Sequence, residues 1–91
     1  MSKKIENVKK PVICVVYDSV ADKFGSPSTF INKNVAVRSF VDLLNTPSYK
    51  EHKSDYSLYY VAFYDESTGT IYDINKHELL IKGSDVIDFA K

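Results

Sequence analysis

The chain has 91 residues, of which 44% are hydrophobic and 26% are charged, and it contains a single cysteine. This length allows one modest hydrophobic core but not two, and the composition is that of a folded globular protein. No apolar run approaches the roughly 20 residues that span a bilayer. One cysteine cannot form a disulfide within the chain. We therefore expect a single folded domain in the cytoplasm, with no membrane partner.

The formal net charge is zero, but the charges are unevenly distributed. Residues 1–10 carry four lysines and one glutamate, which gives +3 and leaves −3 for residues 11–91. Clustered lysines favour contact with a polyanion, because they release counterions from a phosphate backbone. A solvated terminus that aids solubility has the same composition. We expect residues 1–10 to form a flexible basic arm and residues 11–91 to form the domain.

The first elements predicted along the chain are a strand and an amphipathic helix. Residues 12–17 are almost all β-branched or aromatic and are apolar on both faces, which predicts a central strand. Residues 19–33 are rich in turn formers and predict an ordered loop with one helical turn. From Val35, apolar residues recur at helical spacing, with Asn34 as the expected N-cap and residues 45–47 as the stop.

A tyrosine-rich hairpin is the most distinctive segment of the sequence. Residues 55–65 place apolar or aromatic side chains on both faces, which predicts a second central strand. A tight turn at residues 66–69 follows, in which Gly69 is free to adopt a positive φ. Residues 70–74 then return as the partner strand.

The last part of the chain is predicted to add two short elements. A polar turn at residues 75–77 precedes a short strand over residues 78–82, and Ser84 is suited to cap a short C-terminal helix. The expected fold is therefore α+β. It has a small antiparallel or mixed sheet in the order β-α-β-β plus a short strand, with one main helix packed on one face.

The reactive side chains do not predict a catalytic or metal site. His52 and His77 lie in polar turns, with no second histidine or cysteine at metal-ligand spacing. Cys14 lies inside the first apolar run, where a small buried side chain is the simpler interpretation than a nucleophile. No glycine-rich phosphate-binding motif is present. We therefore expect no enzyme activity, no metal and no cofactor.

Aromatic and cationic side chains favour nucleic-acid binding instead. A sheet face with exposed rings beside cations can stack unpaired bases and neutralise phosphates, each base contributing about 1–3 kcal/mol. Simple alternation places Tyr56, Tyr60 and Tyr64 on one face. The same tyrosines are also typical of a dimer interface or of a solvated surface. The alternative role of Arg38, the one arginine, is an ion pair with Asp42 on the helix surface. The candidate nucleic-acid-binding residues are Lys3, Lys4, Lys9, Lys10, Arg38, Tyr56, Tyr60, Tyr64 and Tyr72.

Four short segments occur in an order that resembles a known family. They are Val-Tyr-Asp-Ser at 16–19, Ala-Val-Arg-Ser-Phe at 36–40, Asp-Tyr-Ser-Leu-Tyr at 55–59, and Phe-Tyr-Asp at 63–65 followed by Thr-Gly at 68–69. Over residues 12–74 the chain resembles the small nonstructural protein of gokushovirus-type microviruses, which are phages with small single-stranded DNA genomes. The resemblance implies a nonenzymatic accessory protein, active in the host cytoplasm, that binds single-stranded DNA or assists its synthesis and packaging. The family supplies no agreed binding motif, so no site residue is transferred from it.

Two functions follow from the sequence. The first is single-stranded DNA binding during phage genome replication or packaging, through the basic arm, Arg38 and exposed tyrosines. The alternative is a homodimeric interaction module that docks on a viral replication protein, a capsid protein or a host protein. The neutral overall charge favours the alternative, because dedicated nucleic-acid binders usually carry a basic excess.

Overall fold

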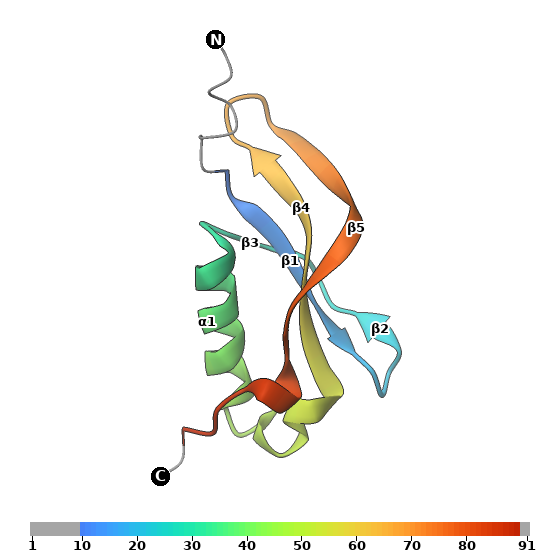
Figure 1. Ribbon diagram of the computed structural model, residues 1–91, viewed down its shortest axis with the longest axis vertical. Helices are drawn as coiled ribbons and strands as arrows, with labels where there is room; N and C mark the ends of the chain where they lie inside the picture. Colours follow the sequence, from blue (N-terminus) through green and yellow to red (C-terminus); the bar gives the residue numbers. More distant parts are fainter. Residues whose placement is uncertain (1–9, 90–91) are drawn as a thin grey trace.

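A computed structural model describes residues 10–89 of the chain (Figure 1). The elements in chain order are β1 (Val12–Asp18), β2 (Lys23–Phe24), β3 (Ser28–Phe30), α1 (Lys33–Leu44), the 3-10 helix η2 (Lys50–Asp55), β4 (Tyr56–Asp65), β5 (Thr70–Lys82) and the 3-10 turn η3 (Gly83–Asp85). All strand pairs are antiparallel, in the order β2-β1-β4-β5, and β3 also pairs with β1. The prediction of a small antiparallel or mixed sheet with one main helix is confirmed in its antiparallel form.

The hydrophobic core lies between α1 and one face of the sheet. Three residues at a spacing of four form the buried stripe of the helix, namely Ala36, Phe40 and Leu44, which are 0%, 3% and 0% exposed. This stripe packs against Cys14 of β1 and Leu58 of β4, both of which are also buried. Burial of this apolar surface, at about 25 cal/mol per Å², is the main force that holds the helix on the sheet.

Both ends of α1 are capped by asparagines. Asn32, and not the predicted Asn34, is the N-cap: its backbone is extended, and its side chain accepts a hydrogen bond from the Val35 amide at 2.9 Å. Asn34 therefore lies inside the first turn. The helix ends at Asn45, as predicted, and the Asn45 side chain donates to the Val41 carbonyl at 2.9 Å.

The segment between β1 and α1 contains two short strands that the sequence does not predict. Residues 19–33 were expected to form a loop with one helical turn, but β2 and β3 pair there with the outer edge of β1. These short strands satisfy backbone groups of β1 that a loop would leave unpaired.

The C-terminal part departs from expectation in two ways. The expected turn at residues 75–77 is a distortion inside the single strand β5, where Asn75 has a φ of 72°. The expected C-terminal helix is only the turn η3, after which the chain is irregular. The Asn45 side chain explains this second difference, because it donates to the Ile87 carbonyl and accepts from the Phe89 amide, at 3.0 and 2.9 Å. Those contacts hold the segment extended across the end of α1.

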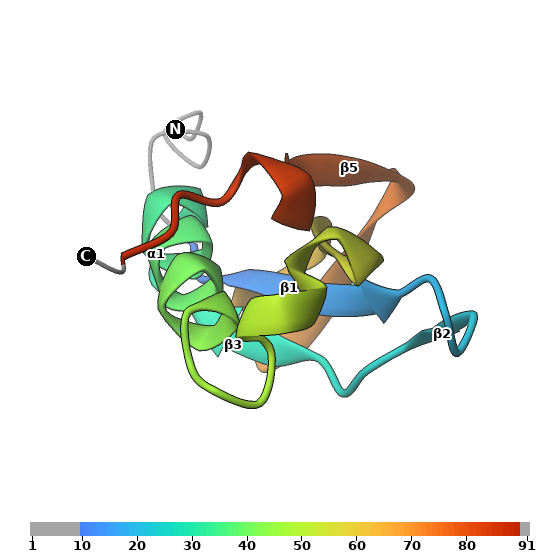
Figure 2. The same cartoon turned by 90° about the horizontal axis from the view of Figure 1, so that it is seen from below.

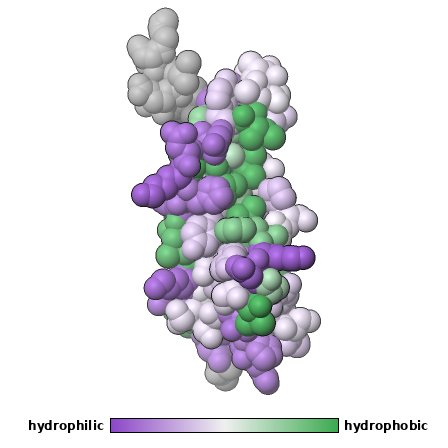
Figure 3. All heavy atoms as spheres, turned by 90° about the vertical axis from the view of Figure 1, so that its right-hand side faces the viewer, coloured by the Kyte–Doolittle hydropathy of each residue, from purple (hydrophilic) through white to green (hydrophobic). Residues whose placement is uncertain are grey.

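The face of the sheet opposite α1 carries no second layer within residues 10–89. Figure 2 shows α1 on one side of β1 and no helix on the other. Figure 3 looks onto that other side, where hydrophobic side chains recur from top to bottom between more hydrophilic regions. The sheet therefore has one covered and one open face.

Candidate nucleic-acid interface

A β-bulge in β4 changes the direction in which its side chains point. Ile13 and Cys14 are neighbours on β1, but their partners on β4 are Ala62 and Tyr60, so Val61 is an extra residue. Paired residues of antiparallel strands share a face, and an extra residue reverses the alternation beyond it. Before Val61 the even-numbered residues of β4 lie on the α1 side of the sheet, and after it the odd-numbered residues do.

The bulge divides the tyrosines of the hairpin between the two faces. Tyr56 and Tyr60 lie on the α1 side and are packed against the core. Tyr64 lies beyond the bulge and, by register, on the open face. The single face of three tyrosines expected from simple alternation is therefore wrong.

Beyond the bulge, an aromatic pair takes the place of Tyr64 on the α1 side. Phe63 pairs with Val12 of β1 and with Tyr72 of β5, so these three residues follow one another across the sheet. The rings of Phe63 and Tyr72 are stacked, with centroids 5.1 Å apart and planes at 19°. Tyr72 is 43% exposed, so one side of its ring remains available to a ligand.

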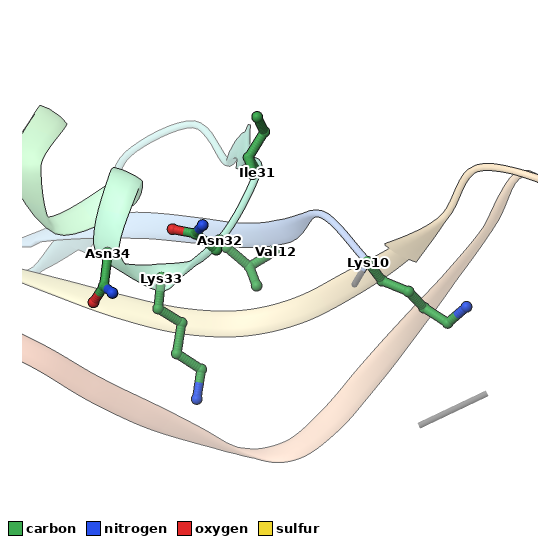
Figure 4. A pocket seen from close by; sticks show the side chains of 6 residues that line it. All are labelled: Lys10, Val12, Ile31, Asn32, Lys33 and Asn34. Atoms are coloured by element: carbon green, nitrogen blue, oxygen red, sulfur yellow. The ribbon is translucent and has the colours of Figure 1, made fainter. Parts of the chain in front are cut away.

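Two lysines lie on the same side of the sheet as this aromatic pair, Lys10 just before β1 and Lys33 in the first turn of α1. They line an open pocket of about 470 Å³ whose lining residues are Lys10, Val12, Ile31, Asn32, Lys33 and Asn34. Figure 4 shows Lys33 pointing from the start of α1 toward β5, and Lys10 extending away from Val12 along the hairpin. The Nζ atom of Lys33 lies 4.8 Å from the centre of the Tyr60 ring. We call the set formed by Lys10, Lys33, Tyr60, Phe63 and Tyr72 the basic-aromatic surface.

Each lysine of this surface has a carboxylate partner. Lys33 is 3.2 Å from Glu78, and the two side chains are 46% and 50% exposed. Lys10 is 3.7 Å from Asp65. Hydrogen bonds from Ser67, helped by Lys10, hold the pKa of Asp65 below its usual value, so this carboxylate stays charged. Exposed ion pairs contribute only about 0–1 kcal/mol. A phosphate can therefore compete for Lys33, whereas Lys10 and Asp65, whose side chains are 19% and 18% exposed, form the more shielded pair.

The Tyr60 phenol is neutral at physiological pH. Burial raises the pKa of this phenol, and the opposing effect of Lys33 is smaller. The lysine over its ring is a cation–π contact of the kind that stabilises both side chains by about 0.5–1 kcal/mol at exposed sites. The contact therefore holds the Lys33 ammonium at the edge of the pocket.

The structure brings together three of the residues predicted from the sequence, namely Lys10, Tyr60 and Tyr72. Tyr56 lies at the other end of β4, where its ring packs edge-on against Tyr49 at 5.1 Å. Arg38 is exposed on α1 and makes no ion pair within the part of the chain that the structure describes. The predicted contacts of Lys3, Lys4 and Lys9 lie outside the described residues.

Two residues of the surface were missed in the sequence. Phe63 was predictable from the sequence, because the four-residue turn that joins Asp65 to Thr70 also sets Phe63 opposite Tyr72. Lys33 had no local signal, because its place beside Tyr60 depends on how α1 docks on the sheet.

The described residues give few signs of other chemistry. Cys14 is buried, and burial raises the pKa of its thiol to about 11. Within residues 10–89, no group of three or more histidine, cysteine or acidic side chains is arranged to hold a metal ion. No helix in that range is both long and apolar enough to cross a membrane.

Comparison with known proteins gives one match. A family model described as Phage ORF5 protein matches residues 11–86, which is most of the chain. No curated protein and no solved structure matches it. The chain therefore belongs to the Phage ORF5 protein family and is a phage protein. This agrees with the phage origin expected from the sequence, while the narrower resemblance to microviruses stays a prediction.

Proposed function

We propose that this member of the Phage ORF5 family is an accessory protein that binds single-stranded DNA during genome replication or packaging in the host cytoplasm. The observation that carries the proposal is the basic-aromatic surface, where the exposed Tyr72 ring shares the α1 side of the sheet with Lys33 over Tyr60 and with Lys10 beside Asp65. We expect the protein to act by binding and to have no catalytic activity.

The aromatic pair supports a stacking role for Tyr72. Phe63 backs one side of the Tyr72 ring, so that the ring is already oriented before a base arrives. A base stacked on such a ring gains about 1–3 kcal/mol, and only an unpaired base has its face free to do so. Single-stranded nucleic acid is therefore the better ligand than a duplex.

The lysines support a role in phosphate binding. When a phosphate replaces Glu78 beside Lys33, the weak exposed ion pair is exchanged for a contact that releases counterions from the DNA. This exchange predicts that binding weakens as salt is added. The open pocket leaves room for a sugar-phosphate backbone to run between Lys10 and Lys33.

Fluorescence anisotropy with a labelled single-stranded oligonucleotide tests the proposal. We expect binding at low salt that weakens steadily at higher salt. Replacing Tyr72 by serine should weaken it about 5- to 150-fold, which corresponds to one lost stacking contact. Lys33→Gln should reduce the salt slope by about 0.7, the value for one phosphate contact to a single strand.

Lys50→Gln is the matched control for Lys33→Gln. Lys50 also pairs with an exposed carboxylate, Asp88, at 3.5 Å, but it lies on η2, away from the pocket. Its replacement should leave affinity and salt slope unchanged. Absence of binding at low salt, or equal effects of the two lysine variants, would contradict the proposed site.

A further inference from the structure

A groove lies between α1 and β1, toward the end of the sheet that is away from the hairpin turn. It consists of two adjoining pockets of about 310 and 180 Å³, which share Val16 of β1 and Leu43 of α1. The smaller pocket is lined mainly by apolar side chains, among them Phe30, Phe40 and Leu58. We call the two pockets together the α1–β1 groove. Its smaller half suits an uncharged, apolar side chain.

The larger pocket carries one carboxylate and two phenols. It is lined by Asp18 of β1, by Tyr56 of β4 and by Tyr49, which caps the start of η2. Asp18 is the cross-strand partner of Tyr56, and paired residues share a face, so both side chains lie on the α1 side. The two tyrosine rings meet edge-on. This half of the groove therefore combines aromatic rings with a negative charge.

The Asp18 carboxylate is not neutralised by the part of the chain that the structure describes. The Val20 and Ala21 amides both donate to its Oδ1 atom, at 3.0 and 3.2 Å. Among residues 10–89, no cationic side chain forms an ion pair with Asp18, and its Oδ2 atom accepts no hydrogen bond. Partial burial, followed by the charge of Asp18, raises the pKa of the Tyr56 phenol. The pocket is therefore negative and can accept a further hydrogen bond.

An arginine side chain has the chemistry that this half of the groove requires. Its planar guanidinium stacks on aromatic rings while its N–H groups bind a carboxylate. A lysine ammonium is more strongly hydrated and has no flat face to stack. A phosphate would be repelled by Asp18, so the groove does not suit DNA.

We propose that the α1–β1 groove binds an arginine side chain of a partner protein, with an apolar neighbour of that arginine in the smaller pocket. A free small cation would leave the smaller pocket empty, so a peptide segment is the better occupant. The groove contains none of the residues of the basic-aromatic surface. Binding in it is therefore independent of the function proposed above.

A titration of the full chain, labelled with nitrogen-15, with a capped Leu-Arg-Leu peptide tests the groove by NMR. We expect saturable shifts of the Gly25 and Ser26 amides, which line the larger pocket, and none at Lys33. The same peptide with citrulline, the uncharged analogue of arginine, should bind about fivefold more weakly, as expected for loss of one partly exposed ion pair. Equal binding of the two peptides, or no saturable shift up to about 10 mM, overturns the proposal.

Asp18→Asn tests the carboxylate. The asparagine keeps the oxygen that accepts from the Val20 and Ala21 amides, so the turn is retained while the charge is lost. The variant should bind the arginine peptide about fivefold more weakly and should not distinguish it from the citrulline peptide. Asp22→Asn is the matched control, because Asp22 lies in the same turn, outside the groove, and asparagine tolerates its φ of 57°. Equal effects of the two variants overturn the proposal.

The smaller pocket is tested separately. A capped Ala-Arg-Ala peptide should bind at least about fivefold more weakly than Leu-Arg-Leu, because it buries less apolar surface. Ser39→Phe, an exposed position of α1 at the edge of this pocket, should remove that difference by filling the pocket. Equal binding of the two peptides to the wild type would show that a lone cation is the ligand and that the peptide is wrong. Asp18→Asn should leave the affinity for single-stranded DNA unchanged, and a loss would mean that the groove is not a separate site.

Discussion

A glycine-to-alanine replacement should destabilise the fold more at Gly83 than at either of the other two glycines. It is buried at the start of η3, where it packs directly against the backbone of η2. A Cβ atom at this position would overlap the carbonyl group of Lys53 and lie 2.7 Å from the carbonyl oxygen of Tyr56. Both neighbours are backbone atoms, so no side-chain rotation relieves the overlap. Gly83→Ala must separate η3 from η2.

Overpacking costs about 1–3 kcal/mol when side chains can adjust, and more when the backbone must move. We therefore expect Gly83→Ala to lower the free energy of unfolding by about 3 kcal/mol or more. In a domain of this size, that change lowers Tm by at least about 12 °C. Thermal and urea unfolding followed by circular dichroism measure both quantities.

The other two glycines are matched controls. At Gly25 the nearest atom to an added Cβ is 3.7 Å away, an ordinary contact, so Gly25→Ala should change stability by less than about 1 kcal/mol. At Gly69 there is open space, but φ is +75°, so Gly69→Ala should cost about 1–2 kcal/mol through backbone strain alone. If Gly83→Ala is as stable as Gly25→Ala, the close approach of η3 to η2 is wrong.

Three further predictions concern the core, the thiol and the C-terminal segment. Leu44→Ala should lower the free energy of unfolding by about 2–5 kcal/mol in urea, because Leu44 is 0% exposed; a smaller loss would mean that α1 is loosely packed. The Cys14 thiol, with a pKa of about 11 instead of 9.0, has about a hundredfold less thiolate at neutral pH, so a disulfide reagent should label it slowly until urea is added. Its labelling rate should rise with pH, and fast labelling at pH 7 would contradict its burial. Asn45→Ala should abolish hydrogen-exchange protection of the Phe89 amide while the α1 amides stay protected; retained protection would show that Asn45 does not hold the segment.

The elements that the sequence predicted well are those with long, unbroken patterns. β1 and β4 are apolar on both faces, and both are inner strands of the sheet. α1 carries its apolar residues at helical spacing and ends at Asn45 as expected. Its start was predicted wrongly at Asn34, because an asparagine there has the same capping ability as the actual N-cap, Asn32. The position of β3, which ends at Phe30, favours the earlier one.

The elements that the sequence did not predict depend on contacts between distant segments. β2 and β3 are too short to carry a pattern of their own and form because the edge of β1 is available. Ser84 is a good cap for a helix, but Val86 is 8% exposed in the core, and Asn45 holds the residues after it. Tertiary contacts therefore override local preference at both places.

The bulge at Val61 was not predicted from the sequence for a different reason. β4 is apolar on both faces, so a reversal of alternation leaves the hydrophobic pattern unchanged. A strand with one polar face would have revealed it, because polar residues would have shifted by one position. The same feature that identified β4 as an inner strand therefore concealed which of its tyrosines share a face.

That reversal decides which aromatic side chains belong to the basic-aromatic surface. Because of the extra residue, Phe63 lies on the α1 side, where it stacks on Tyr72, and Tyr64 lies on the open face. Deleting Val61 would restore regular alternation and exchange the two faces for every residue of β4 beyond it. The deletion should therefore weaken binding of single-stranded DNA, as Tyr72→Ser does, because both disrupt the stacked pair, whereas Leu79→Lys on the open face should leave DNA affinity unchanged. Fluorescence anisotropy on the three variants separates these outcomes, and a deletion variant that stays folded and binds DNA like the wild type would show that the bulge has no part in binding.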